Sequence, residues 1–151
     1  DKYILTEGLS FQQVKNKLEN IFIELPNALG INNHQGSKAT ENIQLMKNVA
    51  RSLKKMDKYF IDSYTSVNSK AFITMRQNGV KTEIRQIFLD NIEHPDSIMK
   101  NLDKLIELSH SMDVAIGIGH VKEETYKILK EQIPILKANG YHFLNVSEIV
   151  R

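Results

Sequence analysis

The stretch Gly30-Ile31-Asn32-Asn33-His34-Gln35-Gly36-Ser37 joins a short apolar run to a polar turn flanked by glycines. Three later apolar runs also end in polar or ionisable residues, namely Asp62-Ser63, Asp90-Asn91 and Gly119-His120. Parallel strands with these ends would place the polar groups on one rim, where α/β sheets and barrels bind ligands. The pattern therefore predicts a functional site built from four strand ends.

The composition is that of a soluble globular chain of single-domain size, with 151 residues, 41% hydrophobic and 25% charged. Twenty basic and eighteen acidic residues nearly balance, and the lysines form no stripe in the sequence, which argues against a nucleic-acid partner. The absence of cysteine excludes thiolate nucleophiles and Cys-based zinc sites. No apolar run approaches the roughly 18 to 20 residues of a membrane span.

The start, Asp1-Lys2-Tyr3-Ile4-Leu5, resembles neither a signal peptide nor an initiator methionine, so we expect the chain to be part of a longer protein. The sequence leaves both the compartment and the oligomeric state open.

Hydrophobic spacing predicts alternating helices and strands. The expected helices cover residues 10–24, 40–53 with Thr40 as cap, 68–78, 96–112 with Asp96 as cap, and 123–139. The expected strands cover residues 28–32, 59–61, 82–89, 114–118 and 141–146. This alternation without hairpin signals favours one α/β domain with a largely parallel sheet, either part of a barrel or an open doubly wound sheet.

His34 is the most informative single residue of the first polar turn. An imidazole can bind zinc or exchange protons near neutral pH, and Asn32, Asn33 and Ser37 offer hydrogen bonds suited to sugar hydroxyls or amides. The alternative is an Asn-rich turn whose side chains satisfy nearby backbone groups. We favour the functional reading because such a turn has no need of a histidine.

His120 follows a strand in which Gly117 and Gly119 allow close approach of backbone or ligand. We expect it to act as a general acid or base. The alternative is a histidine that caps the following helix.

Two carboxylates occupy similar positions after apolar runs. Asp62 could orient an imidazole or bind a metal, or it could simply cap the following turn. Asp90-Asn91 carries the same two interpretations. Arg85, inside an expected strand, predicts a buried carboxylate partner of structural or catalytic kind.

Taken in order, these motifs resemble the divergent polysaccharide deacetylase family. The matching segments are Pro26–Ser37, Phe60–Ser66, Arg85–Asn91 and Ala115–His120, with Tyr64 where the family usually has arginine. The resemblance implies part of a distorted (β/α) barrel. Family members begin with further βα units that carry an Asp-Asp pair, and this chain lacks them.

The resemblance also implies a chemistry, the metal-dependent hydrolysis of the N-acetyl group of an amino sugar in a polysaccharide or oligosaccharide. By the same resemblance, a divalent metal, zinc, polarises the acetyl carbonyl, and the protein is exported to the periplasm or cell surface. We expect His34 as a metal ligand, although either histidine could contact the metal. The remaining expected roles are His120 as general acid, Asp62 as its orienting carboxylate, and Asn32, Asn33, Ser37, Asp90 and Asn91 as substrate-binding groups. A glycan-binding protein without turnover is the alternative.

Overall fold

The computed structural model describes residues 2–151, and its contacts divide the chain into two compact units. Unit 1 comprises Asp1–Ile84 with Val150–Arg151, and unit 2 comprises Arg85–Ile149. Each unit has its own cluster of buried apolar side chains. The expectation of one domain rests on the absence of a linker or repeat in the sequence, and it stays a prediction.

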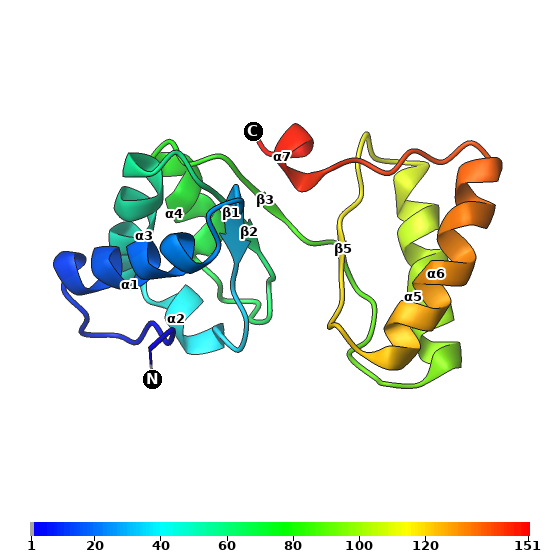
Figure 1. Cartoon of the computed structure of the whole chain (residues 1–151), viewed down its shortest axis with the longest axis horizontal. Coiled ribbons are helices and arrows are strands. Elements are labelled where there is room, and N and C mark those ends of the chain that lie inside the picture. Colours follow the sequence, from blue (N-terminus) through cyan, green and yellow to red (C-terminus); the bar gives the residue numbers. More distant parts are fainter. Residues whose placement is uncertain (1) are drawn as a thin grey trace. The chain divides into compact units, whose positions relative to one another are not determined.

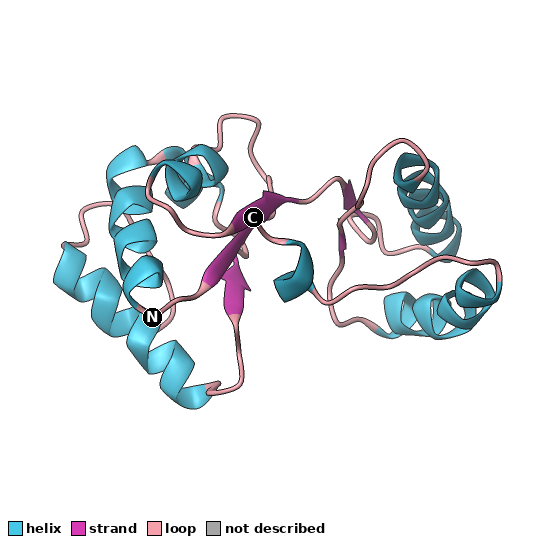
Figure 2. Ribbon diagram, turned by 90° about the horizontal axis from the view of Figure 1, so that it is seen from above, coloured by secondary structure: helices cyan, strands magenta, loops and turns pink. Residues whose placement is uncertain are grey.

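Unit 1 is a short parallel sheet with helices packed against it (Figure 1). Its sheet has the order β1-β2-β3, and both pairings are parallel. Figure 2 shows the helices of this unit on one side of the strands. The elements are α1 (Phe11–Glu24), β1 (Gly30–Asn32), α2 (Ser37–Glu41), α3 (Ile43–Lys55), β2 (Tyr59–Asp62), α4 (Ala71–Gln77) and β3 (Thr82–Ile84).

Local signals position the helices of unit 1. Ser10 and Gln13 form the expected capping box at the start of α1. Helix α3, however, is capped by Asn42, whose Oδ1 accepts a bond from the Leu45 N–H at 2.9 Å. The prediction that Thr40 caps this helix was wrong. Thr40 lies within α2, where its hydroxyl donates to the Ser37 carbonyl at 3.0 Å.

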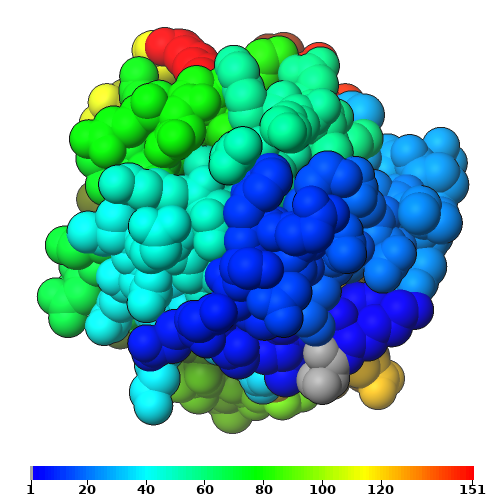
Figure 3. Space-filling model, turned by 90° about the vertical axis from the view of Figure 1, so that its left-hand side faces the viewer, coloured from blue at the N-terminus to red at the C-terminus, as the bar shows by residue number. Residues whose placement is uncertain are grey.

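The core of unit 1 forms where α3 packs between α1 and the sheet. The expected apolar face of α3 is buried, and Val49 is 1% exposed and Leu53 fully buried. It meets Val14 and Leu18 of α1, both of which are also fully buried. Burial of each such side chain contributes about 1.5 to 3 kcal/mol. Figure 3 shows α1 in blue on the outer surface beside the turquoise α3.

Unit 2 pairs two very short parallel strands with two long helices. Ile87 pairs with Gly117 and Phe88 with Ile118. The two helices pack side by side through Ile98, Leu102 and Ile128 (Figures 1 and 2). The elements are β4 (Ile87–Phe88), α5 (Pro95–Ser109), β5 (Gly117–Ile118), α6 (Glu123–Ala138) and α7 (Val146–Ile149).

Two of the expected strands are shorter than the sequence indicates. The run 82–89 is divided between two sheets, with β3 pairing to β2 and β4 pairing to β5. The run 114–118 is a strand only at Gly117–Ile118. Its earlier part is held differently, because the Ile116 N–H donates to the Gln86 side-chain oxygen at 2.6 Å.

The expected strand at 141–146 is absent from the described residues. This segment leads instead into α7, where the Asn145 N–H donates to the Glu148 carboxylate at 2.7 Å. The cap expected of Asp96 was also wrong. Asp96 lies in the first turn of α5, which begins with Pro95, and the N-cap residue is His94 without a side-chain capping bond.

The predicted fold class is confirmed, because the structure is α/β with helices and strands alternating and every strand pairing parallel. Within residues 2–151, no helix combines the length and the apolar character needed to span a bilayer.

Candidate functional site

The ends of β1 and β2 form the polar centre of unit 1. The two strands are parallel, and Asn32 pairs with Ile61. The carboxyl ends of β1 and β2 therefore lie next to each other at the same end of the sheet. The buried Ser63 then links them, since its N–H donates to Asn33 Oδ1 at 2.8 Å and its hydroxyl to the Asn33 carbonyl at 2.7 Å. The Asn32 amide also donates to the Ser63 hydroxyl, at 3.1 Å.

One atom in this centre has an unused capacity to donate. Among residues 2–151, Asn33 Nδ2 is one of two buried side-chain atoms without a hydrogen-bond partner. It lies against the backbone of Gly36, where a Cβ would sit 3.4 Å from the nitrogen. An amide donor left unsatisfied in a buried position costs about 1 to 3 kcal/mol, and a ligand that accepts from it would recover this energy.

The turn that contains His34 is fixed at its C-terminal end, by Ser37. Gln35 has a positive φ of 51°, and Ser37 opens α2 with its hydroxyl 3.2 Å from Thr65 Oγ1. Ser37 thereby ties this turn to the loop that follows β2. His34 itself is exposed.

Asp62 organises the loop between β2 and α4. Its side chain is buried, and it accepts bonds from the Tyr64 N–H at 2.9 Å, the Ser69 hydroxyl at 2.7 Å and the Phe72 N–H at 3.3 Å. These contacts match the capping interpretation of this carboxylate. They also hold Tyr64 in a left-handed conformation, with φ 47°.

The ends of β4 and β5 carry a carboxylate–imidazole pair in unit 2. His120 Nδ1 lies 3.0 Å from Asp90 Oδ1, and the His120 backbone N–H donates to Asp90 Oδ2 at 2.7 Å. Thr125, in the first turn of α6, also donates to Oδ2, at 2.8 Å. The sequence expected Asp62 in this position beside His120; the structure places Asp90 there, because β4 is the strand paired with β5.

The groups around Asp90 determine the pKa of its carboxyl group. Burial raises the pKa of this carboxyl, but the hydrogen bonds from Thr125 and from the backbone and ring of His120 outweigh burial and hold the pKa below its ordinary value. Asp90 is therefore ionised at neutral pH, and Nδ1 of His120 carries the proton that it donates. The Asp90 side chain has no exposed surface, whereas that of His120 is 36% exposed.

Gly119 allows this close approach of backbone and carboxylate. A Cβ at this position would lie 3.3 Å from Thr125 Cγ2 and 3.5 Å from Asp90 Oδ2. Phe88 of β4 lies beside His120, and Arg85, which precedes β4, lies beside Phe88. The Phe88 ring lies 5.3 Å from the His120 ring, and the Arg85 guanidinium lies 5.5 Å from the Phe88 centroid.

Asn91 follows Asp90 and contributes to the support of β4. Its Oδ1 accepts from Asn101 Nδ2 at 3.2 Å, and the same nitrogen donates to the carbonyls of Phe88 at 3.1 Å and Leu89 at 3.0 Å. This network fixes the end of β4 to α5, so that the backbone entering Asp90 is held in place.

The donor set expected of a metal site is incomplete in this chain. Within residues 2–151, no three side chains of the His, Asp and Glu types gather closely enough to hold an ion. The buried carboxylates Asp62 and Asp90 already accept three hydrogen bonds each. The described residues therefore do not fit a metal on their own.

Comparison with known proteins identifies the family of the chain. A model of the divergent polysaccharide deacetylase family matches residues 1–150. The chain belongs to this family. It is 31% identical to YibQ of Escherichia coli K12 over 133 residues, which are 88% of the chain and 42% of YibQ. It is also 31% identical to a Haemophilus influenzae Rd protein over 123 residues, 82% of the chain and 44% of that protein.

The chain thus spans less than half the length of these two family members. Among solved structures, the protein ATU2773 of Agrobacterium tumefaciens C58 superimposes with a TM-score of 0.90 and 20% identity. The match covers 95% of the chain and 58% of ATU2773, and at this identity it shows the fold alone. None of the three names states an activity.

Sequence reasoning assigned no role to three residues that hold the two strand-end centres. Ser63 links β1 to β2, Thr125 fixes Asp90, and Asn101 supports β4. Ser63 carried a signal, since it directly follows Asp62 at a strand end. Thr125 and Asn101 look like ordinary helix residues in the sequence, and only the packing of α6 and α5 shows their roles.

Proposed function

We propose that the protein takes part in removing N-acetyl groups from amino sugars of a polysaccharide, with His120 as the general acid. The observation that carries this proposal is the bond of 3.0 Å between His120 Nδ1 and the ionised, fully buried Asp90. Membership of the divergent polysaccharide deacetylase family supplies the substrate class.

The chemistry assigned to His120 follows from which ring nitrogen is held. Asp90 accepts from Nδ1, so proton exchange with a substrate takes place at Nε2. In the hydrolysis, water adds to the acetyl carbon, the carbon–nitrogen bond breaks, and Nε2 gives its proton to the departing amine. The adjacent carboxylate stabilises the imidazolium that supplies this proton. Asp90 acts only through His120 and is therefore a positioning residue.

This assignment changes two expected roles. Asp90, expected to bind substrate, becomes the residue that orients His120, and Asp62, expected to orient His120, positions the loop after β2. Asn32, Asn33, Ser37 and Asn91 remain proposed substrate-binding groups. Of these, Asn33 has the strongest support, because its buried Nδ2 lacks a partner among the described residues.

The metal is proposed only together with residues outside this chain. The resemblance to the family names a divalent ion, zinc, with His34 as the ligand contributed here. Since residues 2–151 hold no cluster of three candidate ligands, the other ligands and the base that takes the proton of water belong to segments beyond these 151 residues. By the same resemblance, we propose a periplasmic or cell-surface location.

The second candidate is a glycan-binding protein without turnover. The specific observation in its favour is that the polar groups of unit 1 include an unused donor at Asn33, while the described residues complete no metal site. Such a protein would retain recognition of the sugar without any need for proton transfer by His120.

Release of acetate from N-acetylated chito-oligosaccharides by the intact zinc-supplemented protein tests both candidates. We expect acetate from the wild type and a loss of at least about a hundredfold in His120→Ala, with His142→Ala as an exposed histidine control. Absence of acetate with retained oligosaccharide binding would establish the second candidate. Absence of both would exclude the two functions.

A further inference from the structure

The outer face of α3 carries four cations and no carboxylate. These are Lys47, Arg51, Lys54 and Lys55, all exposed, within a helix that contains no acidic residue. In the part of the chain that the structure describes, none of the four belongs to an ion pair, whereas Lys15 on α1 and Lys127 on α6 are paired with glutamates. This face is therefore a local excess of positive charge.

The charge is uneven across the chain as a whole. The stretch that forms unit 1 holds thirteen basic and eight acidic residues, whereas unit 2 holds seven basic and ten acidic. The nearly equal numbers of basic and acidic residues in the whole sequence hide this difference between the units. Four of the thirteen cations of unit 1 lie within nine consecutive residues of α3, and all four are exposed.

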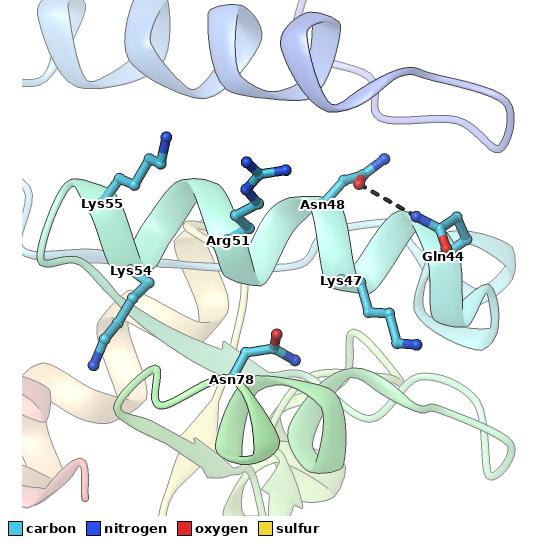
Figure 4. Close-up of a pocket in the computed structure, with 7 residues that line it drawn as sticks. All are labelled: Gln44, Lys47, Asn48, Arg51, Lys54, Lys55 and Asn78. Carbon is cyan, nitrogen blue, oxygen red and sulfur yellow. Dashed lines mark hydrogen bonds between the residues drawn. The ribbon is translucent and has the colours of Figure 1, made fainter.

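The cations surround a hollow rather than a flat surface. The hollow encloses about 430 Å³ and is lined by the four cations together with Gln44, Asn48 and Asn78. Figure 4 shows Arg51 and Lys55 on the side of α3 toward α1, and Lys47 and Lys54 on the side toward Asn78. The cationic row from Lys47 to Lys55 extends for about 12 Å along the helix.

Some of these cations already have local contacts, and their spacing is unfavourable for the isolated helix. Arg51 and Lys55 lie over the Phe11 ring, at 4.0 and 5.3 Å from its centroid, and Lys54 donates to the Gly79 carbonyl at 2.7 Å. Lys47, Arg51 and Lys55 nevertheless repeat at four-residue spacing, where like charges cost a helix about 0.2 to 0.5 kcal/mol per pair. A bound anion would relieve this repulsion.

The lining identifies the chemistry of the ligand. Carboxamides alternate with the cations, and Gln44 Nε2 lies 3.4 Å from Asn48 Oδ1, so donors and acceptors for hydroxyl groups accompany the charges (Figure 4). Among the described residues that line the hollow, there is no aromatic ring for stacking of nucleotide bases and no large apolar side chain for insertion into a bilayer. We propose that this face of α3 binds an anionic polysaccharide.

Binding of polygalacturonate, a carboxylate-bearing polysaccharide, by the intact protein tests this surface. We expect binding that weakens as salt rises, and little binding of neutral dextran. The triple variant Lys47→Gln, Arg51→Gln, Lys55→Gln should bind polygalacturonate about tenfold or more weakly. Because Arg51 lies over the Phe11 ring, melting curves of this triple variant check that it remains folded. The single variant Lys47→Glu provides a second test. Lys47 makes no ion pair in the described chain, and its reversal should weaken binding about threefold or more.

A matched control removes three charges elsewhere. The triple variant Lys38→Gln, Lys100→Gln, Lys104→Gln changes exposed lysines outside α3 and should bind polygalacturonate like the wild type. Equal losses in both triple variants, or tighter binding of single-stranded DNA or anionic vesicles than of polygalacturonate, would overturn the proposal. His120→Ala should leave this binding unchanged, so the result is independent of the proposed deacetylation.

Discussion

The Nδ1 atom of His120 lies 3.0 Å from Oδ1 of Asp90, a carboxylate without any exposed surface. The other carboxylate oxygen, Oδ2, accepts from the His120 backbone and from Thr125, so Asp90 is fixed from both sides. A rigid carboxylate of this kind selects one tautomer and one orientation of the imidazole. The pair is therefore pre-organised before any ligand binds.

Replacing Asp90 by Asn should separate positioning from contact with substrate. The amide keeps the size of the carboxylate but loses its charge, so His120 loses the partner that stabilises its protonated form. We expect acetate release to fall by about two to four orders of magnitude, with a much smaller change in KM. The measurement is steady-state kinetics with N-acetylated chito-oligosaccharides. A raised KM with an unchanged kcat would instead place Asp90 in substrate binding.

The lowered pKa of Asp90 predicts a pH dependence of stability. A carboxyl whose pKa is lower in the folded than in the unfolded protein contributes stability above its ordinary value, 3.8, and this contribution is lost as the pH falls through the folded-state pKa. The wild type should therefore lose more thermal stability than Asp90→Asn when the pH is lowered from 5 toward the acid limit. Melting temperatures of both proteins across this range provide the measurement, and parallel curves would contradict the prediction.

Ser63 should be a structural residue of the first centre, because its hydroxyl bonds to both Asn32 and Asn33. Ser63→Ala removes the two hydroxyl contacts and leaves the part-buried Asn33 carbonyl without this donor. We expect a loss of about 1 to 3 kcal/mol in the free energy of unfolding, measured by urea denaturation. The matched control is Ser147→Ala at an exposed position of α7, which should stay within about 0.5 kcal/mol.

Features that depend only on neighbouring residues could be predicted from the sequence, whereas contacts between distant residues could not. The capping box at Ser10 and the apolar spacing that follows it are properties of adjacent residues, and α1 begins where they indicate. The partner of His120 is not local. Asp62 and Asp90 both follow apolar runs, and only the pairing of β4 with β5 places Asp90 beside the imidazole.

The errors in strand prediction have the same origin. The residues from Thr82 to Leu89 all tolerate extended backbone, so their sequence carries no sign that Ile84 pairs with β2 while Ile87 pairs with β5. The segment 141–146 contains residues favoured in strands, but no described strand pairs with it, and a capping bond to Glu148 starts α7 instead. Propensity was insufficient in both cases because strands require partners distant in sequence.

We expect that β1 needs a glycine at position 30, because the Tyr59 ring of β2 lies close to the Gly30 backbone. It pairs with Tyr59, and a Cβ at Gly30 would lie 2.2 Å from Cδ2 of that ring, so the ring would have to move. We expect Gly30→Ala to lower the free energy of unfolding by about 1 to 3 kcal/mol, measured by urea denaturation. The double variant Gly30→Ala, Tyr59→Ala tests the cause, because without the ring the added methyl group has space. The cost of Gly30→Ala should largely disappear in the Tyr59→Ala background, and simple additivity of the two changes would show that the clash is not its origin.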